Sequence, residues 1–266
     1  MLSSSKNIVK EGILGTRIID LEHVWDVGGK NFPLLKNIQE FLTFYEQKNL
    51  QNNYYTNPNI IYTSDQEMVL NLLDNQLNNI KNNKMNNNII KRSVIQEKAG
   101  SGKSTLINEI ISRIRSVLGD DAVAVAATTG AAAGNVDGKT LHNLLKFPYK
   151  AFKIRNLAKE IARRYQLELK ALPFLIIDEM SMIGGRLLHN IDARFQELFL
   201  NNQEVCGGLI IYMFGDFRQL PPVKDVALFH NSKDDIALKG ITLFKTFELY
   251  HKLQHAHRQS TDSTGF

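Results

Sequence analysis

The stretch 96-QEKAGSGKSTL-106 decides the fold, because it predicts a tight turn between a strand and a helix. The apolar run 93-SVI-95 precedes it, and the amphipathic run 105-TLINEIISRIRSVL-118 follows it. Two glycines, Gly100 and Gly102, let the backbone bend so that its N–H groups point at phosphate oxygens, and the helix N-terminus behind them favours negative charge. The stretch therefore predicts a phosphate-binding loop, with a Gly-rich turn that binds nothing as the alternative.

The end of this loop, Gly-Lys-Ser, indicates which groups of the nucleotide it contacts. Lys103 is expected to reach the β- and γ-phosphates of ATP, and the Ser104 hydroxyl is expected to bind Mg²⁺. The full pattern places a glycine five residues before Gly102, where this chain has Glu97. A carboxylate there is expected to weaken triphosphate binding by repulsion. The residues predicted to hold the nucleotide are Ala99, Gly100, Ser101, Gly102, Lys103, Ser104 and Thr105.

Composition limits the class of protein. The chain has 266 residues, 43% of them hydrophobic, which suffices for one large domain or two small ones with a buried core. The net charge of +5 and the pI of about 9.1 suit a polyanionic partner without requiring one. A single cysteine, Cys206, excludes an intrachain disulfide. The longest apolar runs, such as 209-LIIYMF-214, are too short to cross a bilayer, and the first residues lack the apolar core of a signal peptide, so we expect a soluble intracellular protein.

The part of the chain before the phosphate loop carries less chemistry. Residues 1–60 are interpreted as an N-terminal appendage, with a predicted helix at 34-LLKNIQEFLTFYEQ-47. A second helix is predicted at 63-TSDQEMVLNLLDNQL-77, with Gln66 in its first turn. By spacing alone this Gln is either a solvated surface residue or a reader of the adenine edge. The Asn-rich segment 78–89 is predicted to form a loop, because Asn competes with helix by bonding its own backbone.

Beyond the phosphate loop, 122-AVAVAAT-128 predicts a buried parallel strand. The polar residues after it would lie at the carboxyl end of that strand, where ligands bind in open α/β sheets. They form either a binding loop or a loop with helix caps. The run 153–170 is predicted to be a basic helix that either lies along a nucleic-acid backbone or is a solvated surface. The candidate binding residues of the loop are Thr128, Thr129, Asn135, Thr140 and His142.

Two adjacent acids follow the next apolar strand, in 174-FLIIDEMSMI-183. A strand that carries Asp178 and Glu179 to its carboxyl end places them beside the phosphate loop. Asp178 suits Mg²⁺, directly or through water, and Glu179 suits the base that takes a proton from attacking water. The alternative is a polar start to the helix predicted at 185-GRLLHNIDARFQELF-199.

A third strand ends in polar residues, in 208-GLIIYMFGDFRQLPPV-223. Gln219 held there is expected to touch the γ-phosphate and report its presence. Near the end of the chain, 248-ELYHKLQHAHRQ-259 contains Arg258 and three histidines. A metal site at the histidines is not favoured, because no acid or Cys ligand accompanies them.

The order of these blocks resembles that of the Pif-type (petite integration frequency) DNA helicases, most of all those of rolling-circle transposons and related eukaryotic genes. The resemblance covers about residues 60 to 259. The motif GDFRQLPPV after DEMS is specific, because the DEAD-box helicases have a different motif at the corresponding place. The blocks are AGSGKST, TTGAAAGNVDGKTLH, LIIDEMSMI, GDFRQLPPV and HRQ.

The resemblance implies a RecA-like motor domain of superfamily one, an α/β fold with a central, mostly parallel sheet and helices on both faces. It implies movement in the 5′→3′ direction on single-stranded DNA. It also implies roles for single residues. Gln66 would read adenine, the loop from Thr128 to His142 would touch DNA, Gln219 would sense the γ-phosphate, and Arg258 would reach that phosphate from the edge of a second domain.

We therefore expect an appendage at 1–60 and a motor domain at 61–266, with the second RecA-like domain missing after Phe266. The chain by itself is accordingly expected to bind ATP but not to unwind DNA. The predicted function is the ATP-binding half of an ATP-dependent DNA helicase, whose relatives act in DNA repair, recombination and telomere maintenance. The resemblance places it in the nucleus or, as a second choice, the mitochondrion. The alternatives are a non-enzymatic module that binds nucleotide and single-stranded DNA, and a P-loop ATPase without a nucleic-acid role.

Overall fold

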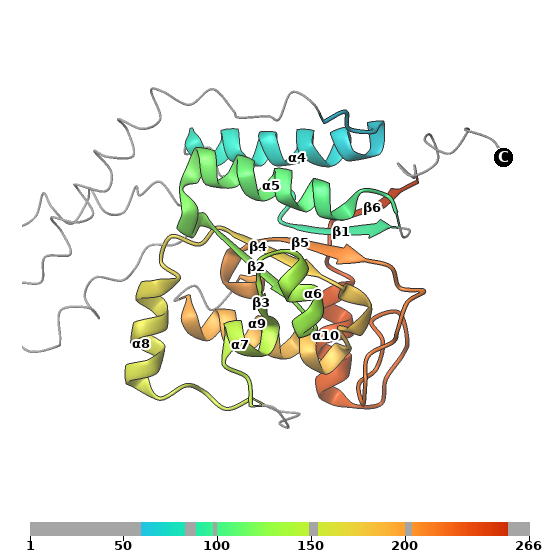
Figure 1. The fold of residues 1–266 in the computed structure, drawn as a ribbon. Coiled ribbons are helices and arrows are strands. Elements are labelled where there is room, and N and C mark those ends of the chain that lie inside the picture. Colours follow the sequence, from blue (N-terminus) through green and yellow to red (C-terminus); the bar gives the residue numbers. More distant parts are fainter. Residues whose placement is uncertain (1–59, 83–88, 98–99, 149–153, 200–203, 255–266) are drawn as a thin grey trace, which may run out of the picture.

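The computed structural model describes residues 60–82, 89–97, 100–148, 154–199 and 204–254. These residues form a six-stranded sheet with helices packed on both of its faces (Figure 1). The strands are β1 (Arg92–Glu97), β2 (Val123–Ala127), β3 (Lys139–Thr140), β4 (Phe174–Asp178), β5 (Ile210–Gly215) and β6 (Leu249–Leu253). The helices are α4 (Ser64–Lys81), α5 (Lys103–Leu118), α6 (Gly130–Asn135), α7 (Leu141–Leu145), α8 (Lys159–Glu168), α9 (Gly185–Leu198) and α10 (Asp235–Phe244). No helix of this described part is long and apolar enough to span a membrane.

Every strand pair in the described sheet is parallel, in the order β3-β2-β4-β5-β1-β6. The loops after β1, β2, β4 and β5 therefore meet at one edge of the sheet, where ligands bind in open α/β folds. The register brings the ends of these strands level, since Gln96 of β1 pairs with Gly215 of β5, and Ala127 of β2 pairs with Asp178 of β4. The predicted α/β fold with a parallel sheet is confirmed.

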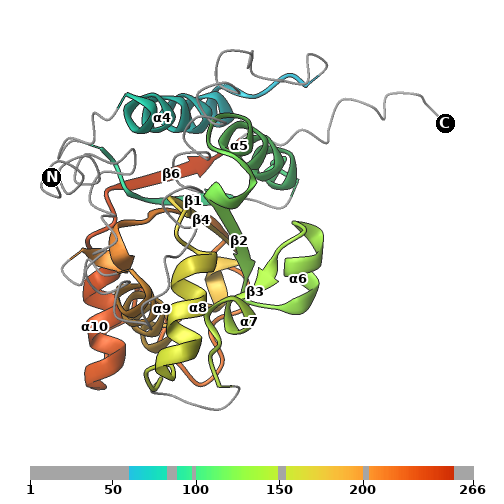
Figure 2. The ribbon, with the colours of Figure 1, turned by 90° about the vertical axis from the view of Figure 1, so that its left-hand side faces the viewer.

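Alternate residues of the central strands face two different cores. Phe174 and Ile176 of β4 pack in a core shared with α4 and α5, whereas Leu175 and Ile177 pack in a core shared with α7 and α9. Strands that are apolar on both faces are typical of a parallel sheet covered on both sides. Figure 2 shows the result, with α4 and α5 on one side of the sheet and α7 to α10 on the other.

The predicted loop over 78–89 is wrong at its start, because α4 continues through Lys81. Ile80 near the end of this helix is buried in the core. Packing of such an apolar residue stabilises the helix more than the Asn residues around it disfavour it. The remaining part of the segment, 83–88, lies outside the described residues.

The basic run at 153–170 is helical over a shorter stretch than predicted, because α8 begins at Lys159 and ends at Glu168. Only Tyr165 of α8 is buried, so the helix contacts the body through a narrow strip. The helix predicted at 34–47 and the N-terminal appendage up to residue 59 lie outside the described residues.

Candidate nucleotide-binding site

The phosphate loop connects β1 to α5 and has the backbone shape that its glycines permit. Gly100 and Gly102 have φ of 86° and 80°, in the left-handed region that favours glycine. Gly102 is the N-cap of α5 and offers no side chain to the first turn, so the N–H groups there are left for a ligand. Ser104 and Thr105 in this turn are exposed, whereas Ser101 is buried. Ala99 lies outside the described residues.

Lys103 begins α5 and its ammonium group is surrounded by acids. Its Nζ lies 2.8 Å from Oδ1 of Asp178, 2.9 Å from Oε1 of Glu97 and 3.0 Å from Oε1 of Glu179. Burial lowers the pKa of Lys103, but the hydrogen bond to Asp178 and the charge of Glu97 outweigh it, so the net pKa is raised. The acids around Lys103 therefore favour its charged form.

Glu97, which replaces the first glycine of the motif, is 4% exposed. One carboxylate oxygen pairs with Lys103, and the other accepts a hydrogen bond of 3.1 Å from the Ser101 hydroxyl. Burial raises the pKa of Glu97 to about 7, although Lys103 and Ser101 both favour its charged form. Glu97 is thus the last residue of β1, and its carboxylate contacts two residues of the phosphate loop.

Asp178 and Glu179 lie at the end of β4, where the sequence predicts them. Asp178 is 3% exposed, and its Oδ1 also accepts a hydrogen bond of 2.8 Å from the Glu179 backbone N–H. Glu179 has φ 56° and ψ 52°, a left-handed conformation that costs energy in any residue other than glycine and is found most often at functional sites. This turn directs the Glu179 side chain back to Lys103.

The left-handed turn at Glu179 is supported from both neighbouring strands. The Thr128 hydroxyl, after β2, donates a hydrogen bond of 3.1 Å to the Glu179 carbonyl. Gly215, at the end of β5, comes so close that a Cβ on it would lie 2.8 Å from the Met180 nitrogen. Only glycine therefore fits at that end of β5.

The loop after β2 uses two of its candidate residues as helix caps. Thr129 accepts a hydrogen bond from the Ala132 N–H at the start of α6, and Thr140 accepts one from the Asn143 N–H at the start of α7. These contacts confirm the capping alternative for both hydroxyls. Asn135 is exposed at the end of α6, and His142 of α7 packs edge-on against Phe147. Contact of this loop with DNA stays a prediction.

The loop after β5 is held at its base by an ion pair. Arg218 donates to both carboxylate oxygens of Asp216, with the shortest contact at 2.6 Å, and this pair lowers the pKa of Asp216 to about 2. Gln96 of β1 donates to Asp216 at 3.3 Å and accepts from the Tyr250 hydroxyl at 2.5 Å. Gln219 is exposed beyond this network.

Gln66 is 1% exposed, which rules out the solvated surface residue that spacing alone allowed. Its amide oxygen accepts a hydrogen bond of 3.0 Å from the Thr63 N–H and closes a capping box at the start of α4. Its amide nitrogen donates to the Ser101 carbonyl at 3.0 Å. Gln66 therefore ties α4 to the phosphate loop, and its role as an adenine reader stays a prediction.

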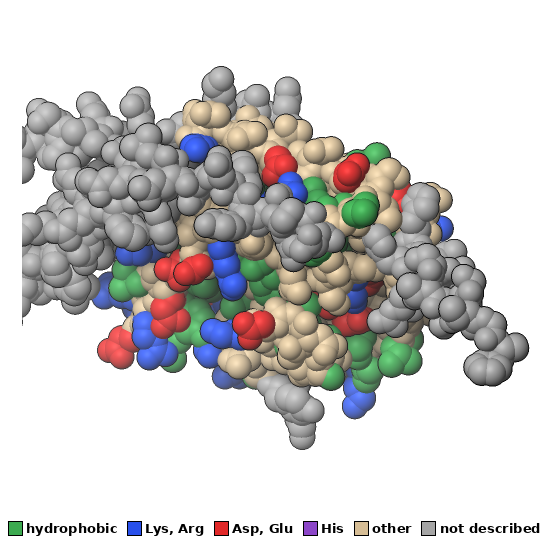
Figure 3. Space-filling model, turned by 45° about the horizontal axis from the view of Figure 1, so that its top comes forward, with side chains coloured by type: hydrophobic (Ala, Val, Ile, Leu, Met, Phe, Trp, Pro, Cys, Tyr) green, Lys and Arg blue, Asp and Glu red, His purple; other side chains and the backbone are tan. Residues whose placement is uncertain are grey.

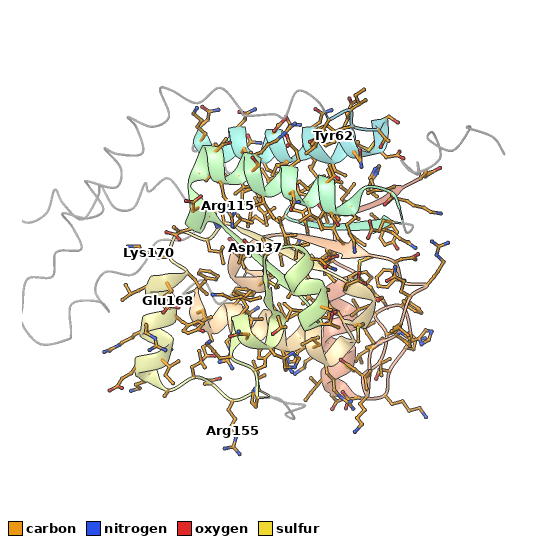
Figure 4. All side chains as sticks on the ribbon, viewed as in Figure 1. Tyr62, Arg115, Asp137, Arg155, Glu168 and Lys170 are labelled. Carbon is orange, nitrogen blue, oxygen red and sulfur yellow. The ribbon has the colours of Figure 1, made fainter. Side chains whose placement is uncertain are left out.

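The charged side chains form no continuous basic stripe on the face that Figure 3 shows, where blue and red groups are interspersed. On α8, Arg164 lies 3.7 Å from Glu168, and both are exposed. Figure 4 places Arg155 below α8, where its side chain extends away from the body. The exposed pair on α8 fits a solvated helix surface, and contact of the run 153–170 with nucleic acid stays a prediction.

Sequence reasoning missed two polar residues of this edge. Gln96 and Tyr250 join Asp216 in one hydrogen-bond network. The signal for Gln96 was its place directly after the predicted strand 93–95, at the edge where ligands bind. Tyr250 lies on β6, which the sequence analysis does not assign, and nothing in its surroundings signals the contact. Arg258 lies outside the described residues.

Comparison with known proteins agrees with this geometry. Residues 63–265 match the family model described as PIF1-like helicase. The ATP-dependent DNA helicase PIF1 of Candida albicans is 38% identical over 152 residues, and the ATP-dependent DNA helicase RRM3 of Saccharomyces cerevisiae is 31% identical over 166 residues. These alignments cover 56% and 62% of this chain, but only 16% and 21% of the relatives.

Solved structures give the same result. The crystal structure of Pif1 helicase from Candida albicans superposes with a TM-score of 0.58 and 32% identity, over 75% of this chain and 41% of that one. Pif1 helicase from Bacteroides in complex with ADP-AlF3 and single-stranded DNA gives 0.55 and 27%, over 77% and 44%. The chain thus spans less than half the length of these proteins. Because the family model covers more than half of this sequence, the chain belongs to the PIF1-like helicase family.

Proposed function

We propose that this chain is the ATP-binding half of an ATP-dependent DNA helicase that moves 5′→3′ along single-stranded DNA. One observation carries the proposal. A phosphate loop places Lys103 within 3.0 Å of both Asp178 and Glu179, at the carboxyl edge of a parallel sheet. Membership of the PIF1-like helicase family supports the choice of DNA over other partners. The division into an appendage at 1–60 and a motor domain at 61–266 belongs to the same proposal.

The reaction is attack of water on the γ-phosphate, and positioning with charge neutralisation supplies most of the catalysis. Lys103 binds the β- and γ-phosphates, and Glu179 takes the proton from the attacking water. The strained Glu179 backbone is held by Thr128, so the base keeps one orientation. Gln219 and Arg258 complete the site around the γ-phosphate in this proposal.

Asp178 and Ser104 are the residues that would hold Mg²⁺. They fit this ion, because Mg²⁺ in nucleotide sites takes one or two protein oxygens together with phosphates, rather than a cage of side chains. When bound, Mg²⁺ would supply positive charge that neutralises the phosphates.

The cellular role follows from the family alone. We propose a function in genome maintenance, which includes DNA repair, recombination and telomere maintenance, and a location in the nucleus or mitochondrion. Imaging of the fluorescently tagged protein together with organelle markers tests the location. Signal in another compartment would contradict it.

Hydrolysis of ATP with and without single-stranded oligonucleotide tests the activity. We expect stimulation by the oligonucleotide, and loss of activity in the Lys103→Ala variant, which lacks the phosphate-binding amine. Hydrolysis that the oligonucleotide does not change would favour an ATPase without a nucleic-acid role. Direction is tested in a protein that also carries a second motor domain: of two duplexes with a 5′ or a 3′ tail, only the 5′-tailed one should be unwound.

A further inference from the structure

Three carboxylates surround the ammonium group of Lys103 in this structure. An ammonium carries three N–H donors, and three carboxylates lie within 3.0 Å of Nζ, one each from Glu97, Asp178 and Glu179. A phosphate that approaches Lys103 therefore competes with these acids for its ammonium group. The three acids differ in what else they can do.

Asp178 and Glu179 have other partners once ATP is bound, namely the metal and the attacking water in the proposed function. Glu97 has none of this kind. It lies at the end of β1, buried, with one oxygen on Lys103 and the other on the Ser101 hydroxyl. Its carboxylate thus bridges two residues of the very loop that has to receive the phosphates.

We propose that Glu97 competes with the triphosphate for the Lys103 ammonium and thereby lowers the affinity of the site for ATP. The inference rests on the proposed nucleotide site and adds to it a built-in competitor. Glycine at position 97 would leave the Lys103 amine to the nucleotide and to the two acids of β4. The competition takes place in the ground state, so Glu97 raises KM and leaves kcat almost unchanged.

A merely structural role predicts the opposite sign. If Glu97 served to hold Lys103 in its productive position, its removal would weaken ATP binding. Burial raises the pKa of Glu97 and makes its charged form costly, which fits a contact that a stronger anion can replace. The direction of the affinity change therefore separates the two roles.

The test is a titration with a fluorescent ATP analogue in the presence of Mg²⁺. We expect Glu97→Gln and Glu97→Gly each to bind about tenfold more tightly than the unmodified chain, about 1.4 kcal/mol. Glu204→Gln is the matched control, because Glu204 forms a Lys–Glu pair of 2.7 Å with Lys91 at the opposite end of β1. Unchanged or weaker binding in both Glu97 variants, with native circular dichroism, would overturn the proposal.

A double-mutant cycle shows whether the effect passes through Lys103. In a Lys103→Ala background, Glu97→Gln should no longer tighten binding, because the contested amine is gone. A tenfold gain that persists there would mean simple charge repulsion and would overturn the competition. The cycle also separates this inference from the proposed function, since Lys103→Ala alone must weaken ATP binding if the loop is a phosphate site at all.

Discussion

The loop between β1 and α5 and the loop after β5 lie at the same edge of the sheet but differ in how far they are assembled. In the first, Lys103 and Glu97 are held by short contacts. In the second, Asp216 and Asp225 are held by hydrogen bonds at the two ends of the loop, whereas Gln219 between them is exposed. The acids and the amine of the predicted phosphate loop thus contact one another, and Gln219, the predicted γ-phosphate sensor, stays exposed.

The exposed side chains near the second loop support this contrast. Leu220 is 72% exposed and Val223 is 75% exposed, whereas no large apolar side chain of β1 or of the described start of α5 is exposed. Large exposed apolar groups are typical of surfaces that another body covers. The comparison shows that the charged residues around Lys103 contact one another in this chain, whereas Gln219 at the same edge of the sheet is exposed.

Replacing Glu179 should produce the largest effect. Glu179→Gln replaces the proposed base but keeps the size of the side chain, so in a protein that also carries a second motor domain ATP hydrolysis should fall by a factor of about 100 or more while ATP stays bound. Single-turnover hydrolysis of radiolabelled ATP measures this. Glu168→Gln, an exposed acid on α8, is the control and should hydrolyse normally. Normal hydrolysis by Glu179→Gln would place the base elsewhere.

Replacing Lys103 should have the next largest effect. Lys103→Ala removes the amine from the closed loop, so ATP affinity should fall at least tenfold, about 1.4 kcal/mol or more. The fluorescent ATP analogue with Mg²⁺ reports it, and Lys91→Ala serves as the control because its amine pairs with Glu204 away from the loop. Affinity unchanged in Lys103→Ala would show that the loop does not bind phosphate.

The buried acid should make stability depend on pH. The pKa of Glu97 is raised from 4.5 to about 7, so the folded state keeps a proton that the unfolded chain loses between these values. Its contribution to stability is complete below pH 4.5 and is lost as pH rises through 7, on the order of 3 kcal/mol. Thermal unfolding of the unmodified chain and of Glu97→Gln, from pH 4.5 to 8, measures this.

The Gln side chain does not titrate, so the Glu97→Gln variant should not lose this contribution as the pH rises. Its melting temperature, relative to that of the unmodified chain, should therefore increase by a few degrees from pH 4.5 to 8. A constant difference across the range would mean that Glu97 titrates normally. Glu204→Gln is again the control, because its ion pair with Lys91 lies away from the phosphate loop.

Gln219 should give the smallest effect. Because its side chain is exposed and the loop around it is open, Gln219→Ala should change ATP affinity less than threefold. Gln196→Ala on α9 provides the control. A tenfold loss would break the comparison, since it would mean that the loop after β5 already contacts the nucleotide in this domain.

The sequence was informative wherever a backbone rule fixes the side chain. The sequence places Lys103 directly after Gly102 of the loop and places two acids directly after an apolar strand. The structure accordingly brings Nζ of Lys103 within 3.0 Å of Asp178 and Glu179. The end of α4 was misjudged because the tertiary burial of Ile80 is not visible in local Asn composition. Contacts between distant segments were equally hidden, as Tyr250 on Gln96 illustrates, because they depend on strand order.

The hydrogen bond from Thr128 to the Glu179 carbonyl connects the backbone of the proposed base to the loop after β2. Thr128 begins the loop predicted to grip DNA, while Glu179 follows a different strand and carries a strained backbone. This one hydroxyl therefore joins the loop predicted to contact DNA directly to the backbone of the proposed base.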